Sequence, residues 1–152
     1  MERTLILIKP DGVCKSLIGR IIERLEKEGL KIVGLKMISL SKEKAEELYL
    51  PHKDKHFFQG LIDFMISAPC VALIAEGKGA IKRVREIIGE TKPEEARPGT
   101  IRNRYAFDGR RNIIHSSDCL LSAQQEISCL FKLEEIYSYE KNDWLKNGGD
   151  KN

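Results

Sequence analysis

A histidine followed directly by hydroxyl and carboxyl groups is the strongest chemical feature of the sequence. His115 ends a short apolar segment and precedes Ser116-Ser117-Asp118. An imidazole nitrogen can attack phosphorus and hold it as a phosphoramidate, which divides one transfer into two easier steps. We therefore predict a nucleophilic His115, with Glu126 holding the far ring nitrogen and fixing its tautomer. The alternative is that His115 only satisfies a buried hydrogen bond.

Phosphoryl transfer depends mostly on positioning and on positive charge around the oxygens of the moving group. Four residues could supply both: Lys9, Arg85, Thr91 and Arg102. Lys9 ends a buried apolar run just before Pro10, which is a costly place for an ammonium group unless an anion meets it. Lys9 is therefore the cation whose position is hardest to explain by surface solvation.

The sequence excludes several common nucleotide-binding and hydrolase motifs. It contains no Gly-x-x-x-x-Gly-Lys-Ser/Thr, no Gly-x-Gly-x-x-Gly, no Gly-x-Ser-x-Gly and no His-Glu-x-x-His. Gly77-Lys78-Gly79 precedes Ala80 and Ile81, so no hydroxyl stands where a phosphate-binding loop needs one for magnesium. The missing motifs exclude P-loop kinases, dinucleotide-binding enzymes, hydrolases with a Gly-x-Ser-x-Gly nucleophile motif and His-Glu-x-x-His zinc peptidases.

Composition fits one globular domain over residues 1–152, with a polar tail from about residue 145. Hydrophobic residues make up 41% and charged residues 32% of the 152 positions, and the formal charge is +3, too small for bulk attraction to nucleic acid or membrane. No apolar run approaches the ~20 residues of a membrane helix. The N-terminus lacks a signal-peptide pattern, which predicts a cytoplasmic protein. Wide spacing indicates reduced thiols at Cys14, Cys70, Cys119 and Cys129.

Strand and helix patterns alternate along the chain. We expect strands at residues 3–8, 30–40, 70–75 and 112–115. Helices are expected from Ile18 to a Gly29 cap, at 41–49, 58–66 and 81–88, and after a capping box at 122–125. This order predicts an α/β (α+β) fold with a ferredoxin-like βαββαβ core, a four-stranded antiparallel sheet and added helices. Residues 90–111 have no period and carry five arginines, which favours a functional loop.

The segment Asn112-Ile113-Ile114-His115-Ser116-Ser117-Asp118 resembles the active-site motif of nucleoside diphosphate kinases, usually Asn-x-x-His-Gly-Ser-Asp. Five further motifs stand in that family's order and spacing, and the resemblance covers about residues 2–139. They are Lys9-Pro10-Asp11-Gly12-Val13, Tyr49-x-x-His52, Phe57-Phe58-x-Gly60-Leu61, Gly89-Glu90-Thr91-x-Pro93 and Arg97-Pro98-Gly99-Thr100-Ile101-Arg102.

The resemblance implies exchange of a γ-phosphate between nucleoside tri- and diphosphates by a ping-pong route through phosphohistidine. His115 would be the nucleophile, supported by Glu126, Tyr49 and Ser117. For the nucleoside, the resemblance implies that Phe57 stacks on the base and that Lys9 and Asn112 reach the ribose 3′-hydroxyl. For the phosphates, it implies that Arg85, Thr91 and Arg102 hold the β- and γ-phosphates and that His52 lies near the α-phosphate. Leu61 is also expected among the substrate-binding residues. Mg²⁺ would be bound through the nucleotide phosphates and not by protein ligands, and the chain would form a homo-oligomer, a hexamer or a tetramer.

Three departures from the family pattern concern the site. Ser116 replaces glycine, and strain of order 1 kcal/mol would follow if its backbone needed φ > 0. His56 replaces the proline before Phe57. Arg110 stands where the usual Gly-Arg-Asn begins and Gly109 where an apolar neighbour of the base is common, so the base-side wall is expected to differ. Trp144 also comes earlier than the family's terminal tryptophan.

Two other functions are compatible with these residues. A binding module could use the basic 97–111 loop to dock nucleic acid or a protein. A protein-histidine phosphate relay could use the same His115 with a protein acceptor. A stacking ring at Phe57, in contrast, predicts an enzyme with broad base tolerance, because every base has a π-face.

Overall fold

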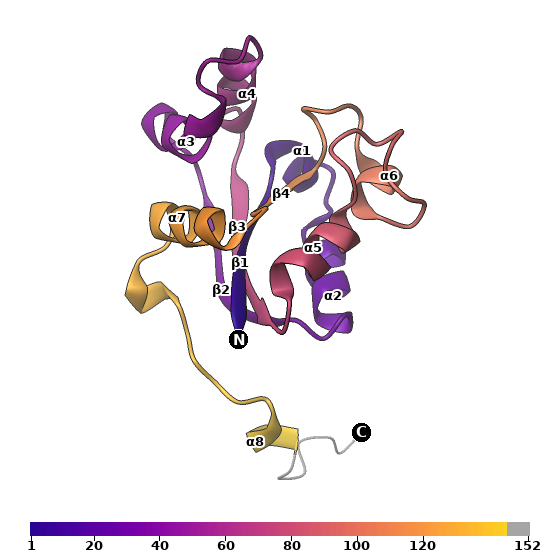
Figure 1. Cartoon of the computed structure of the whole chain (residues 1–152), viewed down its shortest axis with the longest axis vertical. Helices are drawn as coiled ribbons and strands as arrows, with labels where there is room; N and C mark the ends of the chain where they lie inside the picture. Colours follow the sequence, from indigo (N-terminus) through magenta and orange to yellow (C-terminus); the bar gives the residue numbers. More distant parts are fainter. Residues whose placement is uncertain (146–152) are drawn as a thin grey trace.

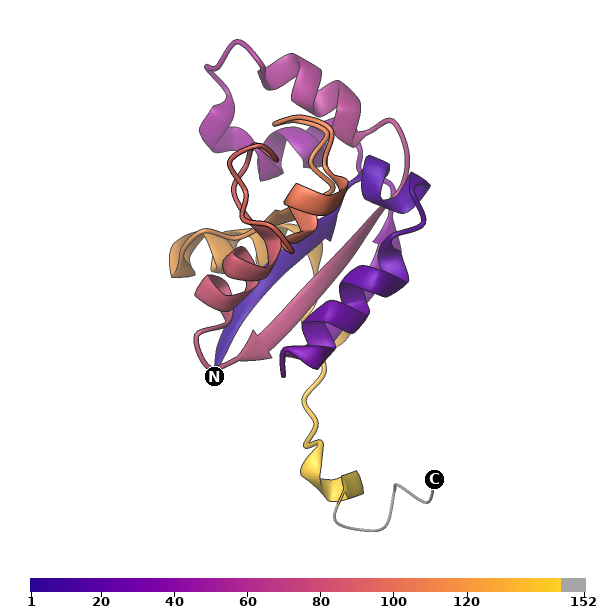
Figure 2. The same ribbon diagram turned by 90° about the vertical axis from the view of Figure 1, so that its right-hand side faces the viewer.

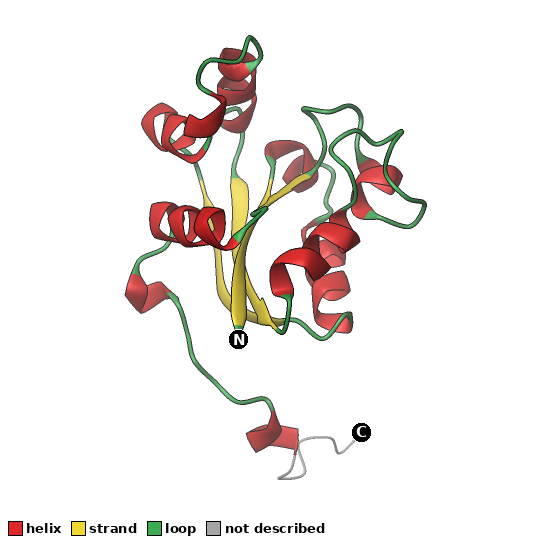
Figure 3. Cartoon of the chain, viewed as in Figure 1, coloured by secondary structure: helices red, strands yellow, loops and turns green. Residues whose placement is uncertain are grey.

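The computed structural model describes residues 1–145, so nearly all of the predicted polar tail lies outside the described residues. Within that range one antiparallel sheet is formed by β1 (Glu2–Ile8), β2 (Lys31–Ile38), β3 (Cys70–Gly77) and β4 (Ile114–Ser116). The strand order is β2-β3-β1-β4, and each neighbouring pair is antiparallel (Figure 3). This arrangement confirms the predicted ferredoxin-like core.

Helices cover both faces of the sheet. Helices α2 (Ile18–Lys27) and α5 (Ala80–Ile88) lie on one side, and α3 (Lys42–Leu48), α4 (Phe58–Met65) and α7 (Leu120–Leu130) lie on the other (Figures 1 and 2). Side chains of a strand alternate between faces. Accordingly Ile6 and Ile8 of β1 enter one hydrophobic cluster while Leu5 and Leu7 enter the other. The central strand β1 therefore anchors the site from both cores.

Two short helices replace segments that were expected to be irregular. Helix α1 (Pro10–Cys14) begins where a turn was predicted, because proline at the first helical position needs no amide partner there. Helix α6 (Ile101–Tyr105) interrupts the segment without period, and the Thr100 side chain caps it by accepting from the Asn103 amide. Three further short pieces are η1 (Leu50–His52), η2 (Leu133–Glu135) and α8 (Asn142–Leu145).

Two predicted boundaries near the site are wrong. Strand β4 covers Ile114–Ser116 and not residues 112–115, because Ile113 has φ +75°, which no strand residue adopts. The capping box at 122–125 does not start α7. Cys119 is the N-cap, with extended backbone and a sulfur that accepts from the Ser122 amide at 3.4 Å, so Ser122 already lies inside the helix.

The expected strain at Ser116 does not occur. Ser116 lies in β4 and is not among the described residues with positive φ; its backbone is ordinary strand. Replacement of glycine by serine therefore adds a buried hydroxyl beside the candidate nucleophile without forcing the backbone. No helix in residues 1–145 has the length and apolar character needed to cross a membrane.

Candidate active site

His115 is held by a carboxylate on α7 and remains accessible. Its Nε2 lies 2.7 Å from Oε1 of Glu126, and its side chain is 20% exposed. The Ser117 hydroxyl donates to the same Glu126 oxygen at 2.9 Å. Hydrogen bonds between Ser117 and Leu5 of β1, at 3.1 and 3.2 Å, fix that hydroxyl to the sheet. The imidazole orientation is thus set by α7 and β1 together.

This geometry assigns different roles to the two ring nitrogens. A carboxylate only accepts hydrogen bonds, so the proton of a neutral imidazole belongs on Nε2. Nδ1 then carries the free lone pair, and within the described chain no hydrogen bond engages it. His115 therefore has one ring nitrogen held by Glu126 and one without a hydrogen-bond partner in the described chain, and its role as a nucleophile stays a prediction.

Two arginines bind the backbone on either side of His115. Arg102 of α6 donates from Nη2 to the Ile114 carbonyl at 2.7 Å and from Nη1 to the Gly89 carbonyl at 3.0 Å. Arg85 of α5 donates from Nη1 to the Ser116 carbonyl at 3.4 Å. Residues far apart in sequence thus bring two guanidinium groups to β4, at the carbonyls that flank the nucleophile.

Arg102 differs from the other loop arginines because it is buried. Its Nε has no hydrogen-bond partner in residues 1–145. Burial, and then the charge of Arg85, lower the pKa of Arg102 to about 10, so the guanidinium is still charged at neutral pH. A buried, partly unpartnered cation is stabilised when an anion arrives.

Lys9 is the second buried cation of the site. Its Nζ donates to Oδ1 of Asn112 at 2.7 Å and to the Arg110 carbonyl at 3.4 Å. Burial is the main cause, and the charge of Arg102 the second, of a pKa lowered from 10.5 to about 7. None of the described carboxylates forms an ion pair with Lys9, so its proton is held weakly until an anion binds.

A strained turn connects Lys9 to the nucleophile. Ile113 has φ +75°, a conformation that costs a β-branched residue roughly 1–3 kcal/mol. Its carbonyl accepts from the Lys9 amide at 2.8 Å and its amide donates to Oδ2 of Asp11 at 3.0 Å. A Cβ on Gly12 would lie 2.9 Å from the same carbonyl. Asp11 and Gly12, whose part sequence analysis missed, therefore hold the turn two residues before His115.

Aromatic rings line the side of the site formed by α3, η1 and α4. The Tyr49 ring meets the His115 ring edge-on, with centroids 5.7 Å apart, and its hydroxyl lies 3.7 Å from the Met65 sulfur. Burial raises the pKa of Tyr49 well above its usual range, so it acts as a neutral wall. The His52 ring lies 5.7 Å from that of Phe57, and its Nδ1 is buried without a partner in the described residues.

Two predicted substrate residues are placed differently from the rest. Leu61 is 7% exposed and packs in the hydrophobic core that α4 covers. Thr91 is exposed, and its carbonyl accepts from Nδ2 of Asn112 at 3.1 Å. Substrate contacts of these two side chains stay predictions.

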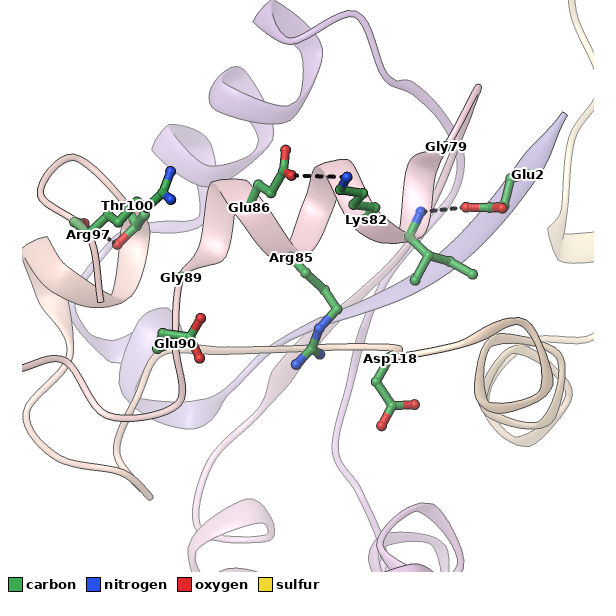
Figure 4. Close-up of a pocket in the computed structure, with 11 residues that line it drawn as sticks. Glu2, Gly79, Lys82, Arg85, Glu86, Gly89, Glu90, Arg97, Thr100 and Asp118 are labelled. Atoms are coloured by element: carbon green, nitrogen blue, oxygen red, sulfur yellow. Dashed lines mark hydrogen bonds and ion pairs between the residues drawn. The ribbon is translucent and has the colours of Figure 1, made fainter. Parts of the chain in front are cut away.

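A cavity of about 660 Å³ runs beside α5. Of the predicted phosphate residues it contains Arg85, which extends from α5 between Glu90 and Asp118 (Figure 4). The lining carries both signs of charge, with the carboxylates of Glu2, Glu86, Glu90 and Asp118 and the cations of Lys82, Arg85 and Arg97. Because four carboxylates line it, this cavity alone does not have the positive charge that a phosphate site needs.

The variant Glu126→Gln tests the positioning of the ring. A neutral amide holds imidazole less firmly and stabilises positive charge on it less, so we expect kcat to fall about 10- to 100-fold with KM for nucleotide nearly unchanged. Steady-state kinetics measures this split. The exposed Glu134→Gln is the matched control, and a rise in KM at constant kcat would contradict the positioning role.

Comparison with known proteins gives one consistent family. The family model described as nucleoside diphosphate kinase matches residues 2–136. A nucleoside diphosphate kinase from Carboxydothermus hydrogenoformans is 53% identical over 147 residues, which is 95% of this chain and 99% of the relative. Two solved structures are also similar. The Aquifex aeolicus nucleoside diphosphate kinase is 49% identical with a TM-score of 0.87, over 90% of this chain and 99% of that one. A Halobacterium salinarum nucleoside diphosphate kinase in complex with CDP is 41% identical with a TM-score of 0.91, over 95% of this chain and 97% of that one.

A histidine on the edge strand is held by Glu126, with Arg85 and Arg102 at the carbonyls beside it, and the family model spans most of the chain. This chain belongs to the nucleoside diphosphate kinase family.

Proposed function

We propose that this protein is a phosphotransferase that moves the γ-phosphate of a nucleoside triphosphate to a nucleoside diphosphate through phosphorylated His115. One observation carries the proposal: Glu126 holds Nε2 of His115 while Arg102 and Arg85 bind the carbonyls on either side of that residue. The arrangement offers a free Nδ1 and two cations at the same point.

The chemistry balances in two half-reactions. Nδ1 of His115 attacks the γ-phosphorus, an N–P bond forms, and the bond to the β,γ-bridging oxygen breaks, which releases the diphosphate. A terminal oxygen of a second nucleoside diphosphate then attacks the phosphoramidate phosphorus, and the imidazole leaves with its lone pair restored. The charge that the ring gains in the intermediate is stabilised by Glu126 at 2.7 Å.

Buried cations supply most of the electrostatic stabilisation. Lys9, Arg85 and Arg102 are proposed to contact phosphate or ribose oxygens, whose negative charge compensates positive groups that have already lost hydration. Asn112 is fixed by Lys9 and by two backbone carbonyls, so Lys9 and Asn112 together can meet the ribose 3′-hydroxyl.

Magnesium fits this site as part of the substrate. In residues 1–145 no cluster of three or more His, Cys, Asp or Glu side chains has the geometry to hold a metal ion. Cations and amides surround His115, so the ligands that suit Mg²⁺ there are nucleotide phosphate oxygens and water. Bound in that way, Mg²⁺ would neutralise charge on the β- and γ-phosphates.

Phe57 is proposed to stack on the base, with His52 beside it toward the α-phosphate. The CDP bound by the Halobacterium salinarum relative supports a nucleoside diphosphate as ligand. We expect Phe57→Ala to raise KM about 5- to 100-fold by a similar factor for all four bases, because stacking gives roughly 1–3 kcal/mol per base. Initial rates with GDP, ADP, CDP and UDP test this, and a loss confined to one base would contradict it.

Labelling tests the proposed function directly. Protein incubated with γ-labelled ATP and Mg²⁺ is expected to acquire label that is stable in base and labile in acid, as a phosphoramidate is, and to lose it to added GDP. The variant His115→Asn should acquire none. Label that survives acid, or that passes to other proteins and not to GDP, would contradict the proposal.

The rival functions receive less support. The five arginines of residues 97–111 do not form one basic surface: Arg102 is buried, Arg111 pairs with Asp108 at 2.6 Å and Arg104 lies over the Tyr105 ring. Family membership likewise favours nucleotides over a protein acceptor. A nucleic-acid or relay role therefore stays secondary.

A homo-oligomer, hexamer or tetramer, is also proposed. The edge strand β2 exposes Leu35 and Met37 by more than half of their surface, and the chain end carries the exposed Trp144 on α8, away from the body (Figure 1). Such apolar surface is typical of a contact with another copy. Sedimentation would measure the assembly.

The cysteines are free thiols, and the cytoplasmic location stays a prediction from the sequence.

A further inference from the structure

Arg110 reaches from the loop before β4 to helix α4. Its Nη1 and Nη2 would lie 2.6 and 2.7 Å from a Cβ built on Gly60, so the guanidinium occupies the space that a glycine leaves free. Gly60 is three residues after Phe57, and residues at that spacing share one face of a helix. The guanidinium therefore lies within one helical turn of the residue proposed to stack on the base.

The backbone of Arg110 is fixed while its side chain keeps its donors free. The Arg110 amide donates to Oδ1 of Asp108 at 3.0 Å, and its carbonyl accepts from Lys9. The neighbouring Arg111 is engaged instead, by Asp108 and over the Phe107 ring. In the described part of the chain no carboxylate or other acceptor bonds to the Arg110 guanidinium, and all its N–H donors remain available to a ligand.

We propose that Arg110 is a specificity-determining residue that favours guanine over adenine when the base stacks on Phe57; this rests on the proposed function. Guanidinium only donates hydrogen bonds. Guanine presents the adjacent acceptors O6 and N7, which match its fork, whereas adenine replaces O6 by an amino donor that opposes it. The base stacks for any nucleotide, and Arg110 then discriminates at the base edge.

The expected bias is moderate. Because the guanidinium is exposed, the contact belongs at the weak end of bidentate arginine–guanine pairs, and kcat/KM should be about fivefold higher for GDP than for ADP. This is compatible with broad base tolerance, which a preference beyond about a hundredfold would contradict.

Variants of both contacting residues test the proposal. Arg110→Met removes every donor of the side chain, and Gly60→Ala places a methyl group where the guanidinium lies. Both should bring the GDP-to-ADP ratio of kcat/KM to about one, and Gly60→Ala in the Arg110→Met background should add nothing. Arg110→Lys keeps donors without the planar fork, so it should retain only part of the preference. Gly60→Ala is expected to fold, since alanine favours helix and the displaced group is the end of a flexible side chain. Arg20→Gln, an exposed arginine on α2, should keep the ratio.

Calorimetric binding of GDP and ADP to the same variants separates base recognition by Arg110 from the proposed phosphotransferase activity. Loss of the GDP preference in both kcat/KM and Kd supports the role of Arg110. An unchanged ratio in Arg110→Met overturns that role and leaves the phosphotransferase proposal intact. If the wild-type protein binds both nucleotides with the preference but transfers no phosphate, the proposed function fails and the base recognition stands.

Discussion

Replacing His115 with asparagine is expected to lower phosphoryl transfer from ATP to GDP by at least about 10⁴-fold, which is roughly 5–6 kcal/mol of activation free energy. Asparagine fits the same space and can still hydrogen bond to Glu126, but its amide nitrogen has no basic lone pair and cannot form the phosphoramidate. The loss should appear in kcat, because the side chains proposed to bind nucleotide remain. Coupled steady-state assays and single-turnover labelling both measure it.

Gln124→Asn is the matched control for that experiment. Gln124 is exposed on α7 and lies outside the hydrogen-bond network of Glu126 and Ser117, so transfer should stay within about threefold of wild type. Thermal unfolding of the two variants should be similar to wild type, which separates lost chemistry from lost folding. Transfer by His115→Asn at more than about 1% of the wild-type rate would contradict a histidine intermediate.

The main strands and helices could be predicted because their signals are local. β3 is buried without a break from Cys70 to Ala75 and follows Pro69, and α5 shows a clear apolar stripe ended by Gly89. Gly89 has φ +92°, and a Cβ there would lie 2.5 Å from the Thr100 hydroxyl. Both the backbone conformation and the lack of space therefore require glycine at this helix end. In both elements the residues that determine the structure are neighbours in the sequence.

The short elements could not be predicted, because they are too short to show a period. Helix α6 has five residues, and its stability depends on the Thr100 cap and on packing against α5. The shift of β4 has another cause, since the positive φ of Ile113 depends on Asp11 and Gly12, about a hundred residues away. Local sequence does not contain that information.

Residue types at the site and one of their pairings could be predicted, but the partners of the arginines could not. The pairing of His115 with Glu126 was expected and is confirmed at 2.7 Å. The loop arginines look alike in sequence, yet tertiary contacts bury Arg102 beside the nucleophile and send Arg110 to Gly60 on α4. The departures at Gly109 and Arg110 from the family pattern signalled an altered base-side wall, but not that Arg110 lies against Gly60.

Lys9→Met is expected to reduce kcat/KM about 10²- to 10³-fold and, without nucleotide, to stabilise the fold. Loss of a cation aimed at developing charge accounts for the first effect. For the second, a pKa lowered from 10.5 to about 7 means that burying the charged form costs roughly 4–5 kcal/mol. Asn112 then lacks one donor, which costs about 1–3 kcal/mol. A net gain of about 2 kcal/mol in the free energy of unfolding is expected at pH 6.

The pH dependence of this gain identifies its origin. Between pH 7 and 10.5 the unfolded chain binds the Lys9 proton and the folded chain does not, so wild-type stability rises with pH through that window. The advantage of Lys9→Met should therefore be largest at pH 6, disappear between about pH 8 and 9, and reverse toward pH 10, where the lost hydrogen bond to Asn112 dominates. Over the same range the kcat/KM of the wild type falls above pH 7 as Lys9 loses its proton. Urea unfolding across that range measures it, with the exposed Lys27→Met as control. Equal stabilisation at all pH values would mean that packing, and not the buried charge, is the cause.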